Sequence, residues 1–242
     1  EPCEIVFDAP GIAPGSGDEA TTATLALHLP DTNLPGGTEI EVMARYGVAW
    51  SYEQGVALCG ASGPATMRAM WAEATSQLGE PLDIAPEAFW SQVPEGVLRH
   101  LETMGPPWRP GVPELLADLS NRGVPMAVVS ASPPELLNAG LQQLPDGFFG
   151  TMVSGPEMPR GKPAPDAYLM AAERLGVETF DCIVVEDSVP GTAAGRASGA
   201  VVIAVPAMLP LPTAPGQVNL DTLAGLTVDD MSRIWHEVRA SE

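Results

Sequence analysis

The strongest constraint on the fold is an alternation of short apolar runs and helical segments in the second half of the chain. Runs with the length and residue types of buried strands occupy residues 125–129, 150–153, 183–185 and 201–205. Segments with helical periodicity lie around them, at residues 112–122, 133–144, 166–175, 189–198 and 228–239. Strands that alternate with helices of this length indicate βαβ units and a parallel sheet. We therefore predict an α/β fold with a doubly wound, Rossmann-like core in three αβα layers.

The first hundred residues follow a different pattern. Residues 4–7 have the composition of a short buried strand, whereas residues 18–103 favour helices and show no convincing strand. One helical face in this region is formed by Met67, Met70, Trp71, Ala74 and Leu78. We predict that the core domain comprises residues 1–16 and 104–242, and that residues 17–103 form an inserted helical cap domain.

Composition limits the partners of the protein. The formal net charge is −20, which argues against nucleic acid or an anionic membrane surface as a partner. No apolar run approaches the roughly 18 residues of a membrane span. The three cysteines, an odd number without metal-site spacing, favour reduced thiols and a cytoplasmic location. The oligomeric state is not encoded in any pattern of the sequence.

Carboxylates follow two of the apolar runs at the point where each run ends. Asp8 comes directly after residues 5–7, and Glu186 and Asp187 come directly after residues 182–185. Carboxylates at neighbouring strand ends repel each other unless a cation lies between them. Mg²⁺ fits such a place, because it prefers oxygen ligands and bridges to a substrate phosphate.

Two further residues indicate a phosphate site. Lys162 is the only lysine of the chain, and it lies in a loop rich in glycine and proline ahead of a helical segment. A compact cation kept alone in such a loop is well explained by a need to face an anion. Ser130 ends the apolar run 125–129, and with the neighbouring backbone N–H of Ala131 it can hold an anion. Ser132 is the better candidate to cap the helix that follows.

These residues lie in four motifs that resemble those of the haloacid dehalogenase-like hydrolases, in the branch with a small helical cap. The resemblance spans nearly the whole chain. In chain order the motifs are Phe7-Asp8-Ala9-Pro10-Gly11, Val129-Ser130-Ala131-Ser132, Gly161-Lys162-Pro163-Ala164-Pro165-Asp166 and Val185-Glu186-Asp187-Ser188.

The resemblance implies a role for each motif. It implies that Asp8 is the nucleophile, which takes a phosphoryl group as an aspartyl-phosphate, and that Ser130 and Lys162 bind that group. It further implies that Asp8, Glu186, Asp187 and the backbone carbonyl of Pro10 hold Mg²⁺. The expected function is a Mg²⁺-dependent phosphatase that acts on a small phosphorylated metabolite.

One residue departs from the resemblance. Phosphatases and phosphomutases of this group have an aspartate two residues after the nucleophile as general acid and base, and this chain has Pro10 there. Proline keeps a carbonyl for the metal but supplies no proton chemistry. Loss of such a group costs about 10²–10⁴ in rate. The alternative is therefore that this chain is a catalytically weakened relative of these enzymes, whose function is to bind a phosphate ligand or a protein.

Other branches of the same family fit less well. The fourth motif of the dehalogenases resembles Ser-Ser-Asn, whereas this chain has Glu186-Asp187-Ser188 at that place. The phosphonoacetaldehyde hydrolases need a lysine in the cap, and residues 17–103 contain none. The cap of the β-phosphoglucomutases has a segment similar to Gly60-Ala61-Ser62, but an arginine follows that serine there, whereas this chain has Gly63.

Overall fold

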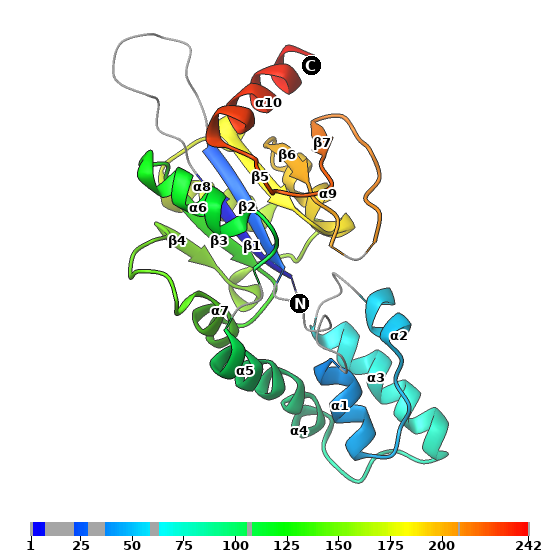
Figure 1. Ribbon diagram of the computed structural model, residues 1–242. Coiled ribbons are helices and arrows are strands. Elements are labelled where there is room, and N and C mark those ends of the chain that lie inside the picture. The colour runs from blue at the N-terminus through cyan, green and yellow to red at the C-terminus, as the bar shows by residue number, and fades with distance from the viewer. Residues whose placement is uncertain are drawn as a thin grey trace.

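A seven-stranded sheet forms the centre of the protein (Figure 1). The computed structural model describes residues 2–7, 22–28, 37–58, 63–105, 108–207 and 209–241. The strands lie side by side in the order β4-β3-β1-β2-β5-β6-β7. In chain order they are β1 (Pro2–Phe7), β2 (Thr22–His28), β3 (Met126–Ser130), β4 (Thr151–Val153), β5 (Cys182–Glu186), β6 (Val201–Ala204) and β7 (Gln217–Asn219).

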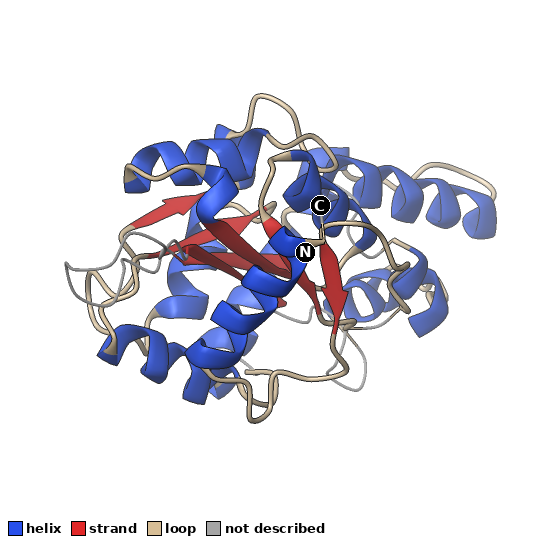
Figure 2. Ribbon diagram, turned by 90° about the horizontal axis from the view of Figure 1, so that it is seen from above, coloured by secondary structure: helices blue, strands red, loops and turns tan. Residues whose placement is uncertain are grey.

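Helices cover both faces of this sheet (Figure 2). Successive strand side chains point to opposite faces, so that Val128 and Ile183 belong to one buried cluster whereas Val129 and Val184 belong to the other. The first cluster includes residues of α6 (Val112–Asn121), α7 (Pro134–Leu141) and α10 (Val228–Ala240). The second includes residues of α8 (Asp166–Leu175) and α9 (Val189–Ala197). The predicted three-layer α/β core is confirmed.

The strand directions agree with the prediction except in β1. Strand β3 is parallel to β4, and β2, β5, β6 and β7 are parallel to one another. Strand β1 belongs to this sheet, as expected, but it is antiparallel to the three strands with which it pairs, β2, β3 and β5. The expectation that the first strand runs parallel to the later ones is therefore wrong for residues 2–7. A short apolar run defines a strand but contains no information on its direction.

The prediction that residues 18–103 contain no strand is also wrong. Strand β2 lies between β1 and β5 and pairs with both. Its sequence, Thr-Ala-Thr-Leu-Ala-Leu-His, mixes threonines with alanine and leucine, which are good helix formers. Pairing on both sides of the strand overrides that local preference, since β-propensity depends strongly on context.

The cap region has a hydrophobic core of its own. It contains α1 (Thr38–Arg45), α2 (Tyr52–Ala57), α3 (Gly63–Leu78), α4 (Pro86–Trp90) and α5 (Gln92–Met104). Its buried cluster is centred on Met43, Met70 and Phe89. Helix α5 contributes Val93 to this cluster and Leu101 to the cluster against the sheet, so that it joins the two. The exact domain boundaries remain a prediction.

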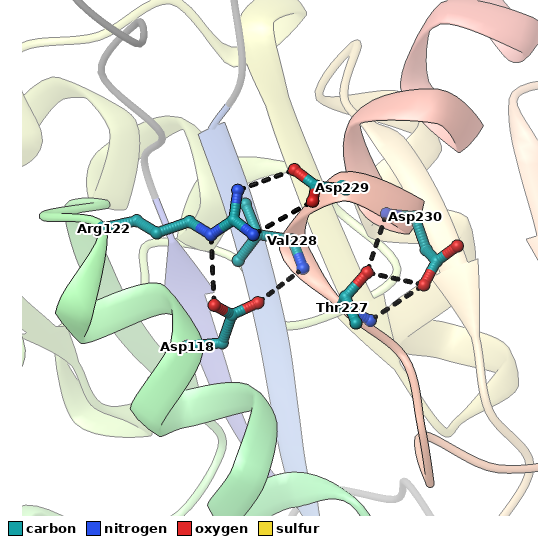
Figure 3. Close-up of polar contacts among 6 residues, drawn as sticks. All are labelled: Asp118, Arg122, Thr227, Val228, Asp229 and Asp230. Carbon is teal, nitrogen blue, oxygen red and sulfur yellow. Dashed lines mark hydrogen bonds and ion pairs between the residues drawn. The ribbon is translucent and has the colours of Figure 1, made fainter.

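The last helix is attached to α6 by a polar network (Figure 3). Asp118 accepts hydrogen bonds from Arg122 Nε at 3.1 Å and from the backbone N–H of Val228 at 3.0 Å. Arg122 also donates to both carboxylate oxygens of Asp229, at 2.6 and 3.1 Å. Asp118 thus satisfies one of the N–H groups that the start of a helix leaves without an intrahelical partner. Within the described ranges, no helix is both long and apolar enough to cross a membrane.

Candidate active site

Lys162 forms a buried ion pair with Glu186. Its ammonium nitrogen lies 3.0 Å from Glu186 Oε1, and the two side chains are 7% and 0% exposed. Lys162 comes from the loop between the short 3₁₀ helix η1 (Gly155–Glu157) and α8, and Glu186 is the last residue of β5. Beside Lys162 the loop is stabilised by Arg160, which donates hydrogen bonds to both carboxylate oxygens of Asp166 at 3.0 and 2.7 Å. Lys162 and Glu186 thus form this ion pair although 24 positions separate them in the sequence.

The carboxylate of Glu186 accepts hydrogen bonds at both oxygens. Oε1 accepts from Lys162 and from the hydroxyl of Tyr168, the latter at 2.6 Å. Oε2 accepts from the backbone N–H groups of Asp187 and Ser188, at 2.9 and 3.1 Å, and from Ser188 Oγ at 3.2 Å. A carboxylate offers about four lone-pair positions, so these five donors use its capacity. Direct metal binding by Glu186 would therefore displace at least one of them.

The start of α9 is shaped around this carboxylate. Ser188 is the N-cap of α9, and its Oγ accepts the backbone N–H of Gly191 at 3.1 Å. A Cβ atom added to Gly191 would lie only 1.7 Å from Glu186 Oε1. Glycine is thus required at this position by the close approach of the carboxylate, and the sequence pattern alone gave no sign of it.

We expect Gly191→Ala to destabilise the protein by about 3 kcal/mol, as an overpacked core position does. Helix propensity alone predicts the opposite sign, because alanine is favoured over glycine inside a helix. Urea unfolding of this variant beside Gly161→Ala measures the difference. Gly161 is a suitable control, since a Cβ there meets nothing within 4 Å. Equal stability of the two variants would contradict the placement of Glu186 against α9.

Asp187 is a second buried carboxylate, 5% exposed, directly after β5. Burial and then the charge of Glu186 raise the pKa of Asp187 to about 7, against the opposing effect of Arg109 and Lys162. Arg109 is held nearby by the carbonyl oxygens of Val205 and Pro206, to which it donates at 2.9 and 2.7 Å. A cation at close range would stabilise the charged form of a carboxylate in such surroundings.

Ser130 and Ala131 form a compact turn at the end of β3. Ser130 is fully buried, and its Oγ accepts the backbone N–H of Ser132 at 3.0 Å. The carbonyl of Ser132 accepts the N–H of Gly155, and a Cβ on Gly155 would lie 2.0 Å from the carbonyl oxygen of Ala131. The capping role predicted for Ser132 is wrong: Pro133 is the N-cap of α7, and no side chain bonds there.

Ser130 and Asp187 lie at the same edge of the sheet. Cys3 of β1 pairs with Ser130 on one side and with Leu27 of β2 on the other. The register of β2 with β5 places Leu27 level with Asp187. The ion pair of Lys162 with Glu186 adds the lysine to this edge. The predicted convergence of these residues follows from the parallel direction of β3 and β5.

Asp8 and Pro10 lie outside the described residues. The last described residue before them is Phe7, which pairs with Ile183 near the amino end of β5. Ser130 and Asp187 are at the opposite, carboxyl ends of β3 and β5. The roles of Asp8 and Pro10 therefore remain predictions from the motif.

The residues at this edge fit a hard divalent cation through Asp187. Its carboxylate is of the oxygen type that Mg²⁺ prefers, and burial, followed by the charge of Glu186, raises its pKa. Within the described part of the chain, no three His, Cys, Asp or Glu side chains form a ready metal cluster. The role of Asp187 as a metal ligand therefore remains a prediction, and it is the carboxylate at this edge whose surroundings fit a cation.

Comparison with known proteins identifies the family. A model of the haloacid dehalogenase-like hydrolases matches residues 42–199, well over half of the chain. The chain belongs to the haloacid dehalogenase-like hydrolase family. The matched part of this family member includes Ser130, Lys162, Glu186 and Asp187, whereas Asp8 and Pro10 precede it.

Two curated relatives of this family member are named as phosphatases. It is 38% identical over 125 residues to the bifunctional riboflavin kinase/FMN phosphatase of Arabidopsis thaliana. This match covers 50% of this chain and 31% of that protein. It is 39% identical over 116 residues to hexitol phosphatase A of Escherichia coli K12, which covers 45% of this chain and 51% of that protein. The chain thus matches only about a third to a half of the length of these relatives.

A solved structure shows the same fold. The haloacid dehalogenase-like chain resembles CbbY from Rhodobacter sphaeroides, crystallised with xylulose-(1,5)bisphosphate, with a TM-score of 0.66 and 21% identity. The similarity covers 80% of this chain and 89% of that chain. This agreement supports the α/β core with its helical region, independently of any activity.

The sequence pattern missed three members of the site: Tyr168, Gly191 and Arg109. Tyr168 had a detectable signal, since it is the only aromatic residue of α8 and lies near the start of this helix, just after the loop that holds Lys162. Gly191 and Arg109 are recognisable only from their contacts. The first is fixed by the carboxylate of Glu186, and the second by two backbone carbonyl groups.

Proposed function

We propose that this protein is a Mg²⁺-dependent phosphatase that acts on a small phosphorylated metabolite. The observation behind the proposal is the buried pair of Lys162 and Glu186 beside Asp187, at the sheet edge that also holds Ser130. A cation with little exposed surface is suited to bind an anion in a site shielded from water. Family membership supports hydrolysis, and the names of two relatives support phosphate esters as substrates.

Each residue at the edge has a role in this proposal. Lys162 binds the phosphoryl oxygens and neutralises their charge, while the hydroxyl of Ser130 and the N–H of Ala131 donate hydrogen bonds to the same group. Asp187 holds Mg²⁺, together with Asp8 and the carbonyl of Pro10. When bound, Mg²⁺ supplies charge stabilisation to the phosphoryl group. We assign Glu186 to Lys162 rather than to the metal, because five donors already occupy its oxygens.

The chemical step of the proposal depends on Asp8. The carboxylate of Asp8 attacks phosphorus, the ester oxygen leaves with the electron pair of the broken bond, and water later releases phosphate from the aspartyl-phosphate. Pro10 supplies no proton to the leaving group and no base for the water. We therefore propose a turnover slower by about 10²–10⁴ than an aspartate at this position gives.

The proposed partner is a small anion and not a macromolecule. The net charge of −20 opposes nucleic acid and anionic lipid, as the sequence predicts. Two relatives are named for FMN and for hexitol phosphates, which are small organic phosphates. A cytoplasmic location is proposed from the odd number of cysteines, and Cys182 is buried in β5.

The experiment that tests this function is hydrolysis of an aryl phosphate with and without Mg²⁺. We expect turnover only with Mg²⁺, and a rise in melting temperature on addition of Mg²⁺ because the metal binds the folded state. Asp187→Asn is expected to abolish both effects. It is also expected to leave the metal-free protein at least as stable at neutral pH, because it removes one of two adjacent buried negative charges.

Asp221→Asn is the matched control, since Asp221 is exposed and remote in sequence from the site motifs. It is expected to retain turnover and the full Mg²⁺ shift. An Asp187→Asn variant with the same Mg²⁺ shift as the control would refute Asp187 as a ligand.

Pro10 favours one second function, a binding protein for phosphate ligands that has lost catalysis. Lys162, Ser130 and Ala131 are retained in that case, and only the proton transfer is missing. Tungstate, a phosphate mimic, then raises the melting temperature while no aryl phosphate is hydrolysed. Turnover that depends on Mg²⁺ and on Asp187 excludes this second function.

A further inference from the structure

Tyr168 contacts both members of the buried ion pair. Its hydroxyl donates to Glu186 Oε1 at 2.6 Å, and its ring centroid lies 5.0 Å from Lys162 Nζ. The side chain is 2% exposed and lies at the third position of α8, which packs on β3 and β4. It is thus held rigidly by the core on one side and touches the site on the other.

The chemical state of Tyr168 is fixed by these surroundings. Burial, and then the negative charge of Glu186, raise the pKa of the phenol well above its usual value. The phenol therefore remains protonated and acts as a donor throughout the range in which enzymes work. A hydroxyl that donates to a carboxylate at this distance makes a charge-assisted hydrogen bond, which is short and strong.

The two contacts limit where the ammonium of Lys162 can lie. Glu186 Oε1 is shared between Tyr168 and Lys162, so that the phenol takes part of the charge that otherwise draws the ammonium toward the carboxylate. The aromatic face of Tyr168 attracts the same ammonium from a second direction. Among the described residues, Glu186 and Tyr168 thus contact the cation from two directions.

We propose that Tyr168 is a positioning residue that holds Lys162, through Glu186 and through its own ring, in the place where a substrate phosphoryl group meets it. The proposal rests on the phosphatase function above. A reacting group displaced by about 1 Å loses up to roughly 10²-fold in rate, so that a support of this kind affects catalysis more than binding.

The test compares Tyr168→Phe with Tyr46→Phe. Each variant removes one tyrosine hydroxyl that is hydrogen-bonded to a side chain, but Tyr46 bonds Gln92 in the cap region. We expect Tyr168→Phe to lower kcat for an aryl phosphate by about tenfold with little change in KM, whereas Tyr46→Phe changes kcat by less than about twofold. Tyr168→Leu, which also removes the ring, is expected to lower kcat further.

A second measurement does not depend on turnover. Lys162 is the only lysine, so that an amine-directed reagent modifies this side chain and the α-amino group alone, and peptide mass spectrometry separates the two. We expect Lys162 in Tyr168→Phe to react about tenfold more slowly than in the native protein or in Tyr46→Phe, because Glu186 Oε1 is no longer shared with the phenol and draws the ammonium more strongly.

The outcomes separate the two proposals. A native protein without turnover, in which Tyr168→Phe still lowers the reactivity of Lys162, overturns the phosphatase function and supports the positioning role. An active native protein in which Tyr168→Phe changes neither kcat nor the reactivity of Lys162 overturns the positioning role. A loss of melting temperature without either change assigns Tyr168 to core packing only.

Discussion

Replacing Lys162 with methionine is expected to abolish phosphate hydrolysis and to destabilise the fold by about 3–5 kcal/mol. Methionine keeps an unbranched apolar side chain of similar length but removes the charge. Glu186, which is fully buried, then has no cationic partner at 3.0 Å. Removing one member of a buried ion pair costs this much because the other charge remains in a poorly solvated place. Urea unfolding and the aryl phosphate assay measure the two effects.

The control for this variant is Arg160→Met in the same loop. Arg160 is 70% exposed and pairs with Asp166, and an exposed pair contributes about 0–1 kcal/mol. We expect its unfolding free energy to fall by no more than this and its turnover to persist. Equal stability of Lys162→Met and Arg160→Met would contradict the buried pair.

A double variant separates charge from catalysis. Glu186→Gln in the Lys162→Met background removes the uncompensated negative charge, and part of the lost stability is expected to return. Hydrolysis is expected to remain absent, since the cation that faces the phosphate is still missing. Recovery of activity in the double variant would exclude Lys162 as a phosphate ligand.

The core of the fold could be predicted because its strands and helices differ strongly in pattern. Strands β3, β5 and β6 are continuous apolar runs, as strands buried on both faces are. Helix α8 ends at Gly176, which adopts the left-handed conformation that glycine permits without strain. These local signals agree with the global arrangement, and the three-layer core follows from them.

The parts that could not be predicted depend on long-range pairing. Strand β7 has three residues and no apolar run, and it is defined only by its ladder with β6. Strand β2 has a composition compatible with a helix and becomes a strand between β1 and β5. The direction of β1 depends on which neighbours it meets, and a run of a few apolar residues specifies that poorly.

The candidate site divides in the same way. Ser130 and Asp187 were identifiable because a serine and a carboxylate stand where a strand ends, at an edge where side chains from separate strands converge. Lys162 was identifiable because it is the only lysine and lies in a loop rich in glycine and proline. The relation among Glu186, Tyr168 and Gly191 was not identifiable. It depends on the hydrogen bond of Tyr168 to Glu186 and on the close approach of the Glu186 carboxylate to Gly191, and no spacing rule encodes them.

Replacing Asp8 with asparagine is expected to lower phosphate turnover by on the order of 10³-fold or more, because the amide cannot form the aspartyl-phosphate. The native protein is expected to accumulate that intermediate as a burst, since Pro10 provides no base for the second step. Intact-protein mass spectrometry after acid quenching detects the covalent phosphate, and we expect none on Asp8→Asn.

The direction of β1 makes the choice of control decisive for this prediction. Phe7, the residue before Asp8, pairs near the amino end of β5, whereas β2 runs parallel to β5, so that its carboxyl end points to the edge that holds Asp187. Asp31 is the first carboxylate after β2 in the sequence, as Asp8 is the first after β1. Asp31→Asn is therefore the matched control, and we expect it to keep both the burst and the turnover. Loss of both in Asp31→Asn, with Asp8→Asn unaffected, would transfer the nucleophile from the first motif to the segment after β2. The phosphate-binding roles of Lys162 and Ser130 would remain, because they depend on β3, β5 and the loop before α8 and not on which N-terminal strand delivers the attacking carboxylate.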